Sequence, residues 1–244
     1  MRKVRLFILL VFVLALFTSA VKVNAINTGF ETKQLSVEEK NNFLSNMDLL
    51  RIDEEPEIRS SISCFDVNSN GLIAIGRFGV DEKKTVCVYS DEGVFQYGYK
   101  FDCRIFGVEW DEENLNICFG GIMVSLTPSG EILDVLDVPD TQENTSYWNN
   151  TIEATKRRVG DNEYIIRNDM GMLFEIFAPS YSQVVVIDAT GSESIIYDAG
   201  HGNIIAMILF FVVFFAVGLV TIIVVVRKAV RQSDKNTYSP LKKE

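Results

Sequence analysis

The sequence predicts a mainly β ectodomain with a short N-terminal helix, joined to one C-terminal transmembrane helix. Residues 62–198 alternate short runs rich in Val, Ile, Phe and Tyr with clusters of Asn, Asp, Gly and Ser, which is typical of strands and turns. Residues 204–226 are 23 consecutive positions without a charge, and about 20 apolar residues suffice to cross a bilayer. Residues 1–25 have the layout of a secretory signal.

The signal consists of a basic start, an apolar run and small residues. Three basic side chains precede an uninterrupted apolar run of 12 residues, Leu6 to Phe17. Small or aliphatic residues at 18–20 and 23–25 suit a signal peptidase, and we expect cleavage after Ala25. An uncleaved signal anchor is the alternative, because the apolar stretch can be extended past Lys22.

Charges around the C-terminal span predict its orientation. Residues 227–244 hold six basic and two acidic side chains, and the excess of Lys and Arg on cytoplasmic segments places this tail inside. Residues 26–203 then lie outside the plasma membrane, with 31 acidic and 13 basic side chains and a net charge of −18. The span itself contains no ionisable residue, which favours an anchor over a channel or transporter.

Composition excludes several classes of function. At a net charge of −10 the chain is not a nucleic-acid binder, because such binding needs Lys and Arg against the phosphates. With 48% apolar residues it is not disordered. One histidine, His201, leaves no pair of metal-ligating imidazoles, and no phosphate-binding loop or nucleophile elbow is present. We expect no cofactor.

The ectodomain begins with one expected helix. Ser36 and Glu39 have the spacing of a capping box, and apolar residues recur at helical spacing from Val37 to Met47. The acidic segment 53–56, which ends in proline, separates this helix from the first strand.

A weak repeat organises the strands. Three segments share one pattern, an apolar residue, a hydroxyl or Asp, two variable residues and then glycine: 89–93, 126–130 and 187–191. Strand-forming runs flank each of them, so each predicts a hairpin in which glycine takes a positive φ. Two further strand pairs precede the first two hairpins, from Phe65 to Ile75 and from Phe106 to Cys118, and their first residues are 41 apart. A period near 40 with four strands is that of a propeller blade.

Residues 62–198 resemble the blades of β-propellers of the NHL and tryptophan-aspartate repeat type. More loosely, the whole chain is similar to single-pass surface proteins of Gram-positive bacteria that carry such blades. We count three blades, the third interrupted by the polar stretch 139–160, whereas closed propellers have at least four. An incomplete propeller, a twisted meander and a β-sandwich all fit. Three blades leave two open sheet edges, which the helix 37–47 and the stretch 139–160 are expected to cover.

Four cysteines lie in the expected first two blades: Cys64, Cys87, Cys103 and Cys118. An even number in an exported domain permits two disulfides. Their spacing contains no Cys-x-x-Cys pair, which argues against zinc, and apolar neighbours suit buried free thiols equally well.

Residues 66–71 match the first half of a calcium loop, with Asp66, Asn68 and Asn70 as candidate ligands and glycine at the sixth position. The twelfth position is Arg77, where an EF-hand needs glutamate, and the flanks are expected strands. We favour a hairpin turn in which Asn70-Gly71 supplies positive φ and Asp66 caps the turn.

These features predict a membrane-anchored interaction module that displays an acidic β-rich domain for a protein, peptide or glycan partner. An accessory subunit of a membrane complex, docked through the span, is the alternative. A cell-wall or glycan hydrolase ranks third. Such an enzyme would use a pair of carboxylates, and the cluster 111–113 supplies them, but a domain this acidic contains such clusters whether or not it is an enzyme.

Overall fold

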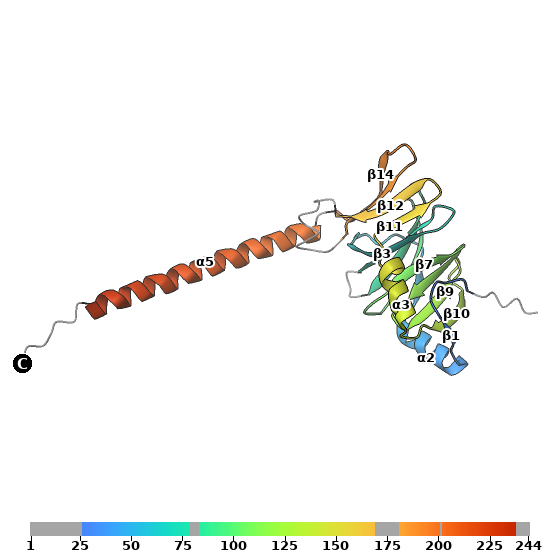
Figure 1. Ribbon diagram of the computed structural model, residues 1–244, viewed down its shortest axis with the longest axis horizontal. Helices are drawn as coiled ribbons and strands as arrows, with labels where there is room; N and C mark the ends of the chain where they lie inside the picture. The colour runs from blue at the N-terminus through green and yellow to red at the C-terminus, as the bar shows by residue number, and fades with distance from the viewer. Residues whose placement is uncertain (1–25, 79–82, 169–180, 201, 238–244) are drawn as a thin grey trace, which may run out of the picture.

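The computed structural model describes residues 26–78, 83–168, 181–200 and 202–237. These residues form three antiparallel sheets and a long C-terminal helix that leads away from them (Figure 1). The expected signal segment 1–25, His201 and the tail after residue 237 lie outside the described residues. Cleavage after Ala25 and the orientation of the chain therefore stay predictions.

Each sheet contains four consecutive strands in a meander. The first sheet contains β3 (Ile62–Val67), β4 (Ile73–Phe78), β5 (Lys84–Tyr89) and β6 (Phe95–Phe101). The second contains β7 (Gly107–Asp111), β8 (Asn114–Cys118), β9 (Ile122–Leu126) and β10 (Ile132–Asp137). The third contains β11 (Lys156–Val159), β12 (Asn162–Arg167), β13 (Gln183–Ile187) and β14 (Glu193–Asp198). All five hairpins expected from the sequence are confirmed.

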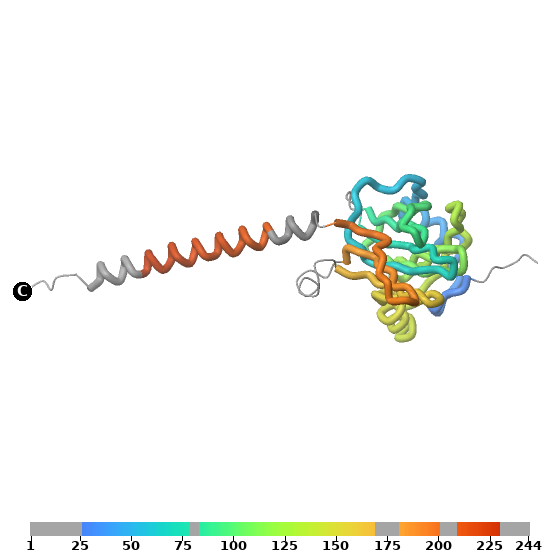
Figure 2. Tube along the Cα trace, turned by 90° about the horizontal axis from the view of Figure 1, so that it is seen from above, coloured from blue at the N-terminus to red at the C-terminus, as the bar shows by residue number. Residues whose placement is uncertain are grey.

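The first sheet is buried on both faces, because it packs between the other two (Figure 2). Val86 and Tyr99 belong to a core shared with Ile117 of the second sheet. Residues on the opposite face, such as Ile75, share a second core with Tyr164 of the third sheet. Residues 73–77 are accordingly buried without interruption, a pattern otherwise typical of central parallel strands.

Short strands on either side of the N-terminal helix cover two sheet edges. β1 (Lys33–Gln34) pairs with β10, and β2 (Leu50–Ile52) pairs with β6. Between them, α2 (Val37–Met47) starts with the Ser36–Glu39 capping box and packs Met47 into the core. We expected the helix itself to cover an edge, and this was wrong: a helix has no free backbone groups along its side, so the extended residues around it pair with the sheets.

The polar stretch 139–160 does not interrupt the third blade as a single insertion. The end of this stretch, residues 156–159, forms β11, which is the first strand of the third sheet. The remainder forms α3 (Gln142–Tyr147) and the π-helical turn η1 (Trp148–Ile152), which pack with Phe30 on the outer face of the second sheet. Ile152, Met123 and Leu136 are buried in this third core.

The three sheets stack face to face but do not close into a propeller ring within the described residues. A mainly β fold of three antiparallel sheets is therefore what the structure establishes.

The two ends of this stack differ. Hairpin turns gather at the end that points away from the C-terminal helix (Figure 1); we call them the distal turns, residues 68–72, 90–94, 112–113, 127–131, 160–161 and 188–192. The connections 102–106, 119–121 and 138–155 lie at the opposite, helix-side end.

The C-terminal helix α5 (Gly202–Thr237) starts four residues after β14 ends. Its stretch Leu209–Ala229 is 21 residues long, has a mean hydropathy of 3.2 and has no buried side chain. Among the described residues this is the one helix long and apolar enough to cross a bilayer. The helix begins two residues before the expected span 204–226. It also continues past residue 226, because the basic segment that follows the span is helical as far as Thr237.

Candidate interaction surface

Four of the distal turns share one hydrogen-bond pattern. In each, the glycine N–H donates to the carbonyl three residues earlier, at 2.9–3.1 Å. The side-chain oxygen of that earlier residue accepts the N–H of the residue four positions after it, at 2.9–3.2 Å. The glycines have φ between 79° and 88°, where a side chain would be strained. The four residues that supply the side-chain oxygen are Asn68, Ser90, Thr127 and Asp188.

The segment with the calcium-like pattern is one of these four turns. Asn68 Oδ1 accepts the N–H groups of Asn70 and Leu72, both at 2.9 Å, and Gly71 has a φ of 81°. Asn68 therefore caps the turn, not Asp66 as expected, because a side chain can reach N–H groups two and four residues ahead. The turn itself was expected, and the pattern of asparagine, two variable residues and glycine could have identified Asn68 as its cap.

Asp66 instead joins the three sheets. Its Oδ1 accepts Arg157 Nε at 2.7 Å, and its Oδ2 accepts the N–H of Trp110 at 2.8 Å. Arg157 also donates to the carbonyl of Phe65 at 3.1 Å. Both carboxylate oxygens of Asp66 are therefore engaged in contacts between sheets. Among the described residues, no group of three His, Cys, Asp or Glu side chains could hold a metal ion.

The two-residue turn between β7 and β8 has an unusual backbone. Glu112 has a φ of 56°, a left-handed conformation that glycine or asparagine adopts more readily. Its carbonyl accepts Asn68 Nδ2 at 3.3 Å, which ties this turn to the neighbouring one. The structure thus holds a glutamate in a strained position at the tip of a hairpin.

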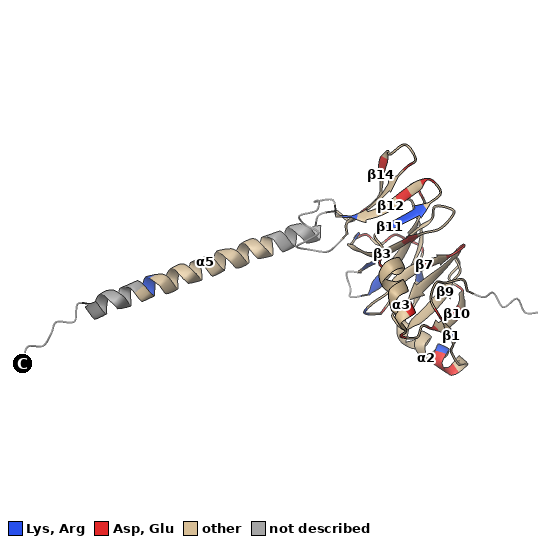
Figure 3. Ribbon diagram, in the orientation of Figure 1, with Lys and Arg blue, Asp and Glu red and all other residues tan. Residues whose placement is uncertain are grey.

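Acidic side chains dominate the distal turns. Figure 3 shows acidic segments at the hairpin ends that point away from α5. The six turns contain no Lys or Arg and seven carboxylates, all exposed: Asp91, Glu92, Glu112, Glu113, Glu131, Asp161 and Asp188. We call these seven the distal carboxylates. Like charges gathered at one end of a domain create a field that attracts cationic groups.

Two basic side chains near this end form ion pairs. Arg51 forms an ion pair with Asp53 and donates to the carbonyl of Pro128 at 3.1 Å. Lys156 lies 3.9 Å from Glu163. The pKa of Asp188 is below its usual range because the hydroxyl of Thr190 and backbone N–H groups donate to the carboxylate, so it is ionised at neutral pH.

The cysteines are free thiols in the structure. Cys64, Cys87 and Cys118 are buried, and Cys103 is half-buried. Burial raises the pKa of Cys64 to about 12 and that of Cys103 to about 11. Such thiols are protonated at neutral pH and react slowly, so the alternative of buried free thiols describes this geometry.

A buried arginine joins the first and third sheets, and no sequence pattern indicated it. Arg77 is 1% exposed and donates to Tyr197 Oη at 3.1 Å, Thr85 Oγ1 at 3.2 Å and Cys87 Sγ at 3.0 Å. Nearby, Tyr89 Oη donates to Glu55 at 2.7 Å. Since these groups satisfy one another inside the fold, they stabilise the sheet interface.

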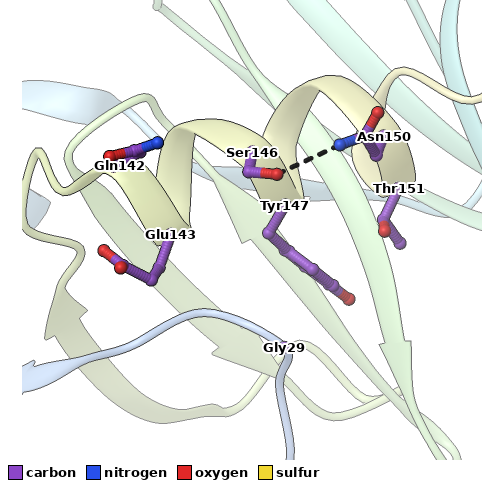
Figure 4. A pocket seen from close by; sticks show the side chains of 7 residues that line it. All are labelled: Gly29, Gln142, Glu143, Ser146, Tyr147, Asn150 and Thr151. Atoms are coloured by element: carbon purple, nitrogen blue, oxygen red, sulfur yellow. Dashed lines mark hydrogen bonds between the residues drawn. The ribbon is translucent and has the colours of Figure 1, made fainter.

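The hollow drawn in Figure 4 lies over α3 and η1 and has a volume of about 540 Å³. Its side chains are spread along the helix surface and do not converge on one point (Figure 4). Tyr147 donates to Glu109 at 2.5 Å, and the same carboxylate accepts Thr28 Oγ1 at 2.7 Å and the N–H of Gly29 at 3.2 Å. This buried glutamate therefore holds the N-terminal segment on the second sheet.

Comparisons with protein-family models, with curated proteins and with solved structures found no match for this chain.

Proposed function

We propose that the chain is a single-pass membrane protein whose β domain binds a basic protein or peptide through the distal carboxylates. One observation carries this proposal: five turns from all three sheets bring seven exposed carboxylates to one end of the domain, with no Lys or Arg among the turn residues. That end faces away from the apolar helix. An acidic surface of this kind fits a cationic partner and speeds its association.

The architecture supports presentation of this surface over catalysis. The distal turns are held by their own side-chain hydrogen bonds and by the link from Asn68 to Glu112. A rigid scaffold that displays loops at one end is a common design for binding. In this reading, the β domain lies outside the plasma membrane and residues 227–244 lie in the cytoplasm.

A photo-crosslinking amino acid at Glu113 of the full chain, in its native membrane, tests this function. We expect a discrete adduct that disappears when Asp91, Glu92 and Glu112 are changed to their amides. The matched control neutralises three exposed acids elsewhere, Glu38, Glu57 and Glu143, and should keep the adduct. Absence of an adduct at Glu113, or its persistence in the first variant, would refute the proposal.

A further inference from the structure

Three hollows meet at the helix-side end of the β stack. Their volumes are about 520, 350 and 180 Å³. Ile105, in the connection between the first and second sheets, lines all three and is 65% exposed. A large aliphatic side chain thus forms an exposed ridge between neighbouring depressions, and nothing in the described fold covers it.

The surroundings of Ile105 combine aromatic, cationic and acidic side chains, and the acidic residues that line the hollows are Asp102, Asp137, Asp140 and Glu153. Phe78 is 49% exposed and lines the smallest hollow together with Trp148 and Arg104. Lys84 Nζ lies 4.3 Å from the centre of the Phe78 ring. Tryptophan and long basic side chains are enriched at the boundary between lipid headgroups and hydrocarbon, where exposed apolar side chains can also be buried.

Chain length brings this end close to the bilayer. Residues 199–201 link β14 to α5 and span at most about 10 Å. The two helical residues before the expected span 204–226 add about 3 Å at 1.5 Å each. Headgroups occupy about 5–7 Å on each side of the hydrocarbon core. The C-terminal end of β14, at the helix-side end of the stack, therefore lies close to the headgroups.

The charges of the two ends favour one orientation. The distal carboxylates are repelled by an anionic lipid surface, which turns them away from it. The helix-side end carries both signs of charge, because Arg104 and Lys84 lie next to Ile105 and Phe78 among the acidic residues of the hollows.

We propose that Ile105, Phe78 and Trp148 contact the lipid interface of the membrane that α5 crosses, so that the β domain rests on the bilayer by its helix-side end. This inference rests on the proposed membrane span. It adds a second lipid contact to the anchor and holds the distal carboxylates at a fixed height above the surface.

The two tryptophans of the chain provide the test, because they lie toward opposite ends. Trp148 borders the hollows around Ile105, whereas Trp110 is on β7, two residues before Glu112. The full chain is reconstituted into phosphatidylcholine and phosphatidylglycerol vesicles with brominated acyl chains, as Trp110→Phe and as Trp148→Phe. We expect quenching of Trp148 emission to exceed that of Trp110 several-fold.

Substitutions then test whether Phe78 and Ile105 are needed for the quenching of Trp148. Phe78→Asp with Ile105→Asp should reduce Trp148 quenching to the level of Trp110. The matched control Val94→Asp with Ile195→Asp changes two side chains that are 55% and 54% exposed and should leave it unchanged. Weak quenching of both tryptophans, or equal strong quenching of both, would overturn the proposal even if the aspartate variant fails to fold. Carbonate extraction separately tests the span, so loss of the lipid contact is distinguishable from loss of the anchor.

Discussion

The two ends of the β stack are built by opposite means. The distal turns are short, and four of them repeat one local hydrogen-bond pattern with glycine at positive φ. The described helix-side connections 102–106, 119–121 and 138–155 differ from one another in length, and Ile105 and Phe78 are exposed at this end. Turns that satisfy their own backbone groups leave their other side chains free to carry charge, whereas connections between sheets must pack against whatever lies beside them. Local chemistry therefore shapes one end, and sheet packing shapes the other.

Removal of residues 26–50 from the full chain should have the largest effect. It takes away β1, α2 and the first residue of β2, and so exposes the edge of β10 and weakens the cover on the edge of β6. We expect oligomers or aggregates in size-exclusion chromatography with light scattering, in detergent. A folded monomer would show that these edges need no cover.

Arg157→Met should break the junction that places the ends of the three sheets together. The pair with Asp66 is 13% and 16% exposed, and removal of one partner from a buried pair costs about 3 kcal/mol. Chemical denaturation measures the loss. Arg167→Met is the matched control: its pair with Glu193 is 40% and 48% exposed, and we expect a loss below about 0.5 kcal/mol. Equal losses would mean that Arg157 has no special role.

Substitution of a turn glycine by alanine should cost more stability where the added Cβ would meet a neighbouring atom. Gly191→Ala adds a Cβ with no atom within 4 Å, so it should cost only the positive-φ penalty of about 1 kcal/mol. A Cβ at Gly93 would lie 2.6 Å from the carbonyl oxygen of Ile196, so Gly93→Ala should cost more. Denaturation midpoints of the two variants test this order, and the reverse order would contradict the packing of the first sheet on the third.

Glu112→Gly should stabilise the protein by about 1 kcal/mol, because glycine adopts the left-handed backbone without strain. The same substitution removes one distal carboxylate and should weaken the crosslink from Glu113. Thermal denaturation and crosslinking of this variant show whether Glu112 lowers the stability of the protein while it strengthens partner binding. A fall in melting temperature would show that the glutamate side chain supports the fold.

Calcium should have no effect on stability. A ligand stabilises a protein only by binding the folded state, and the oxygens of Asp66 and Asn68 Oδ1 already accept hydrogen bonds. The melting temperature should be the same with calcium and with chelator. A rise with calcium that is lost in Asp66→Ala would restore the metal-site hypothesis.

Sequence patterns located the hairpins well, because hairpin formation depends on neighbours in the chain. The glycines at 93, 130 and 191 each close a turn, and the capping box at Ser36 is present. The expectation that Asp66 caps the turn at residues 66–71 was wrong for a different reason. It assigned Asp66 to its own loop, but Arg157, 91 residues away, takes that carboxylate.

The sequence by itself determined the mainly β class, the turns and an apolar segment long enough to cross a bilayer, since each follows from residue types within a short window. Only the tertiary structure decided the stacking of three sheets, the pairing of β1 and β2 with sheet edges, and the burial of Arg77 between sheets. It also decided that seven carboxylates share one end. These features depend on contacts between segments far apart in the chain, and the strand period that makes a hairpin says nothing about which sheet packs on which face.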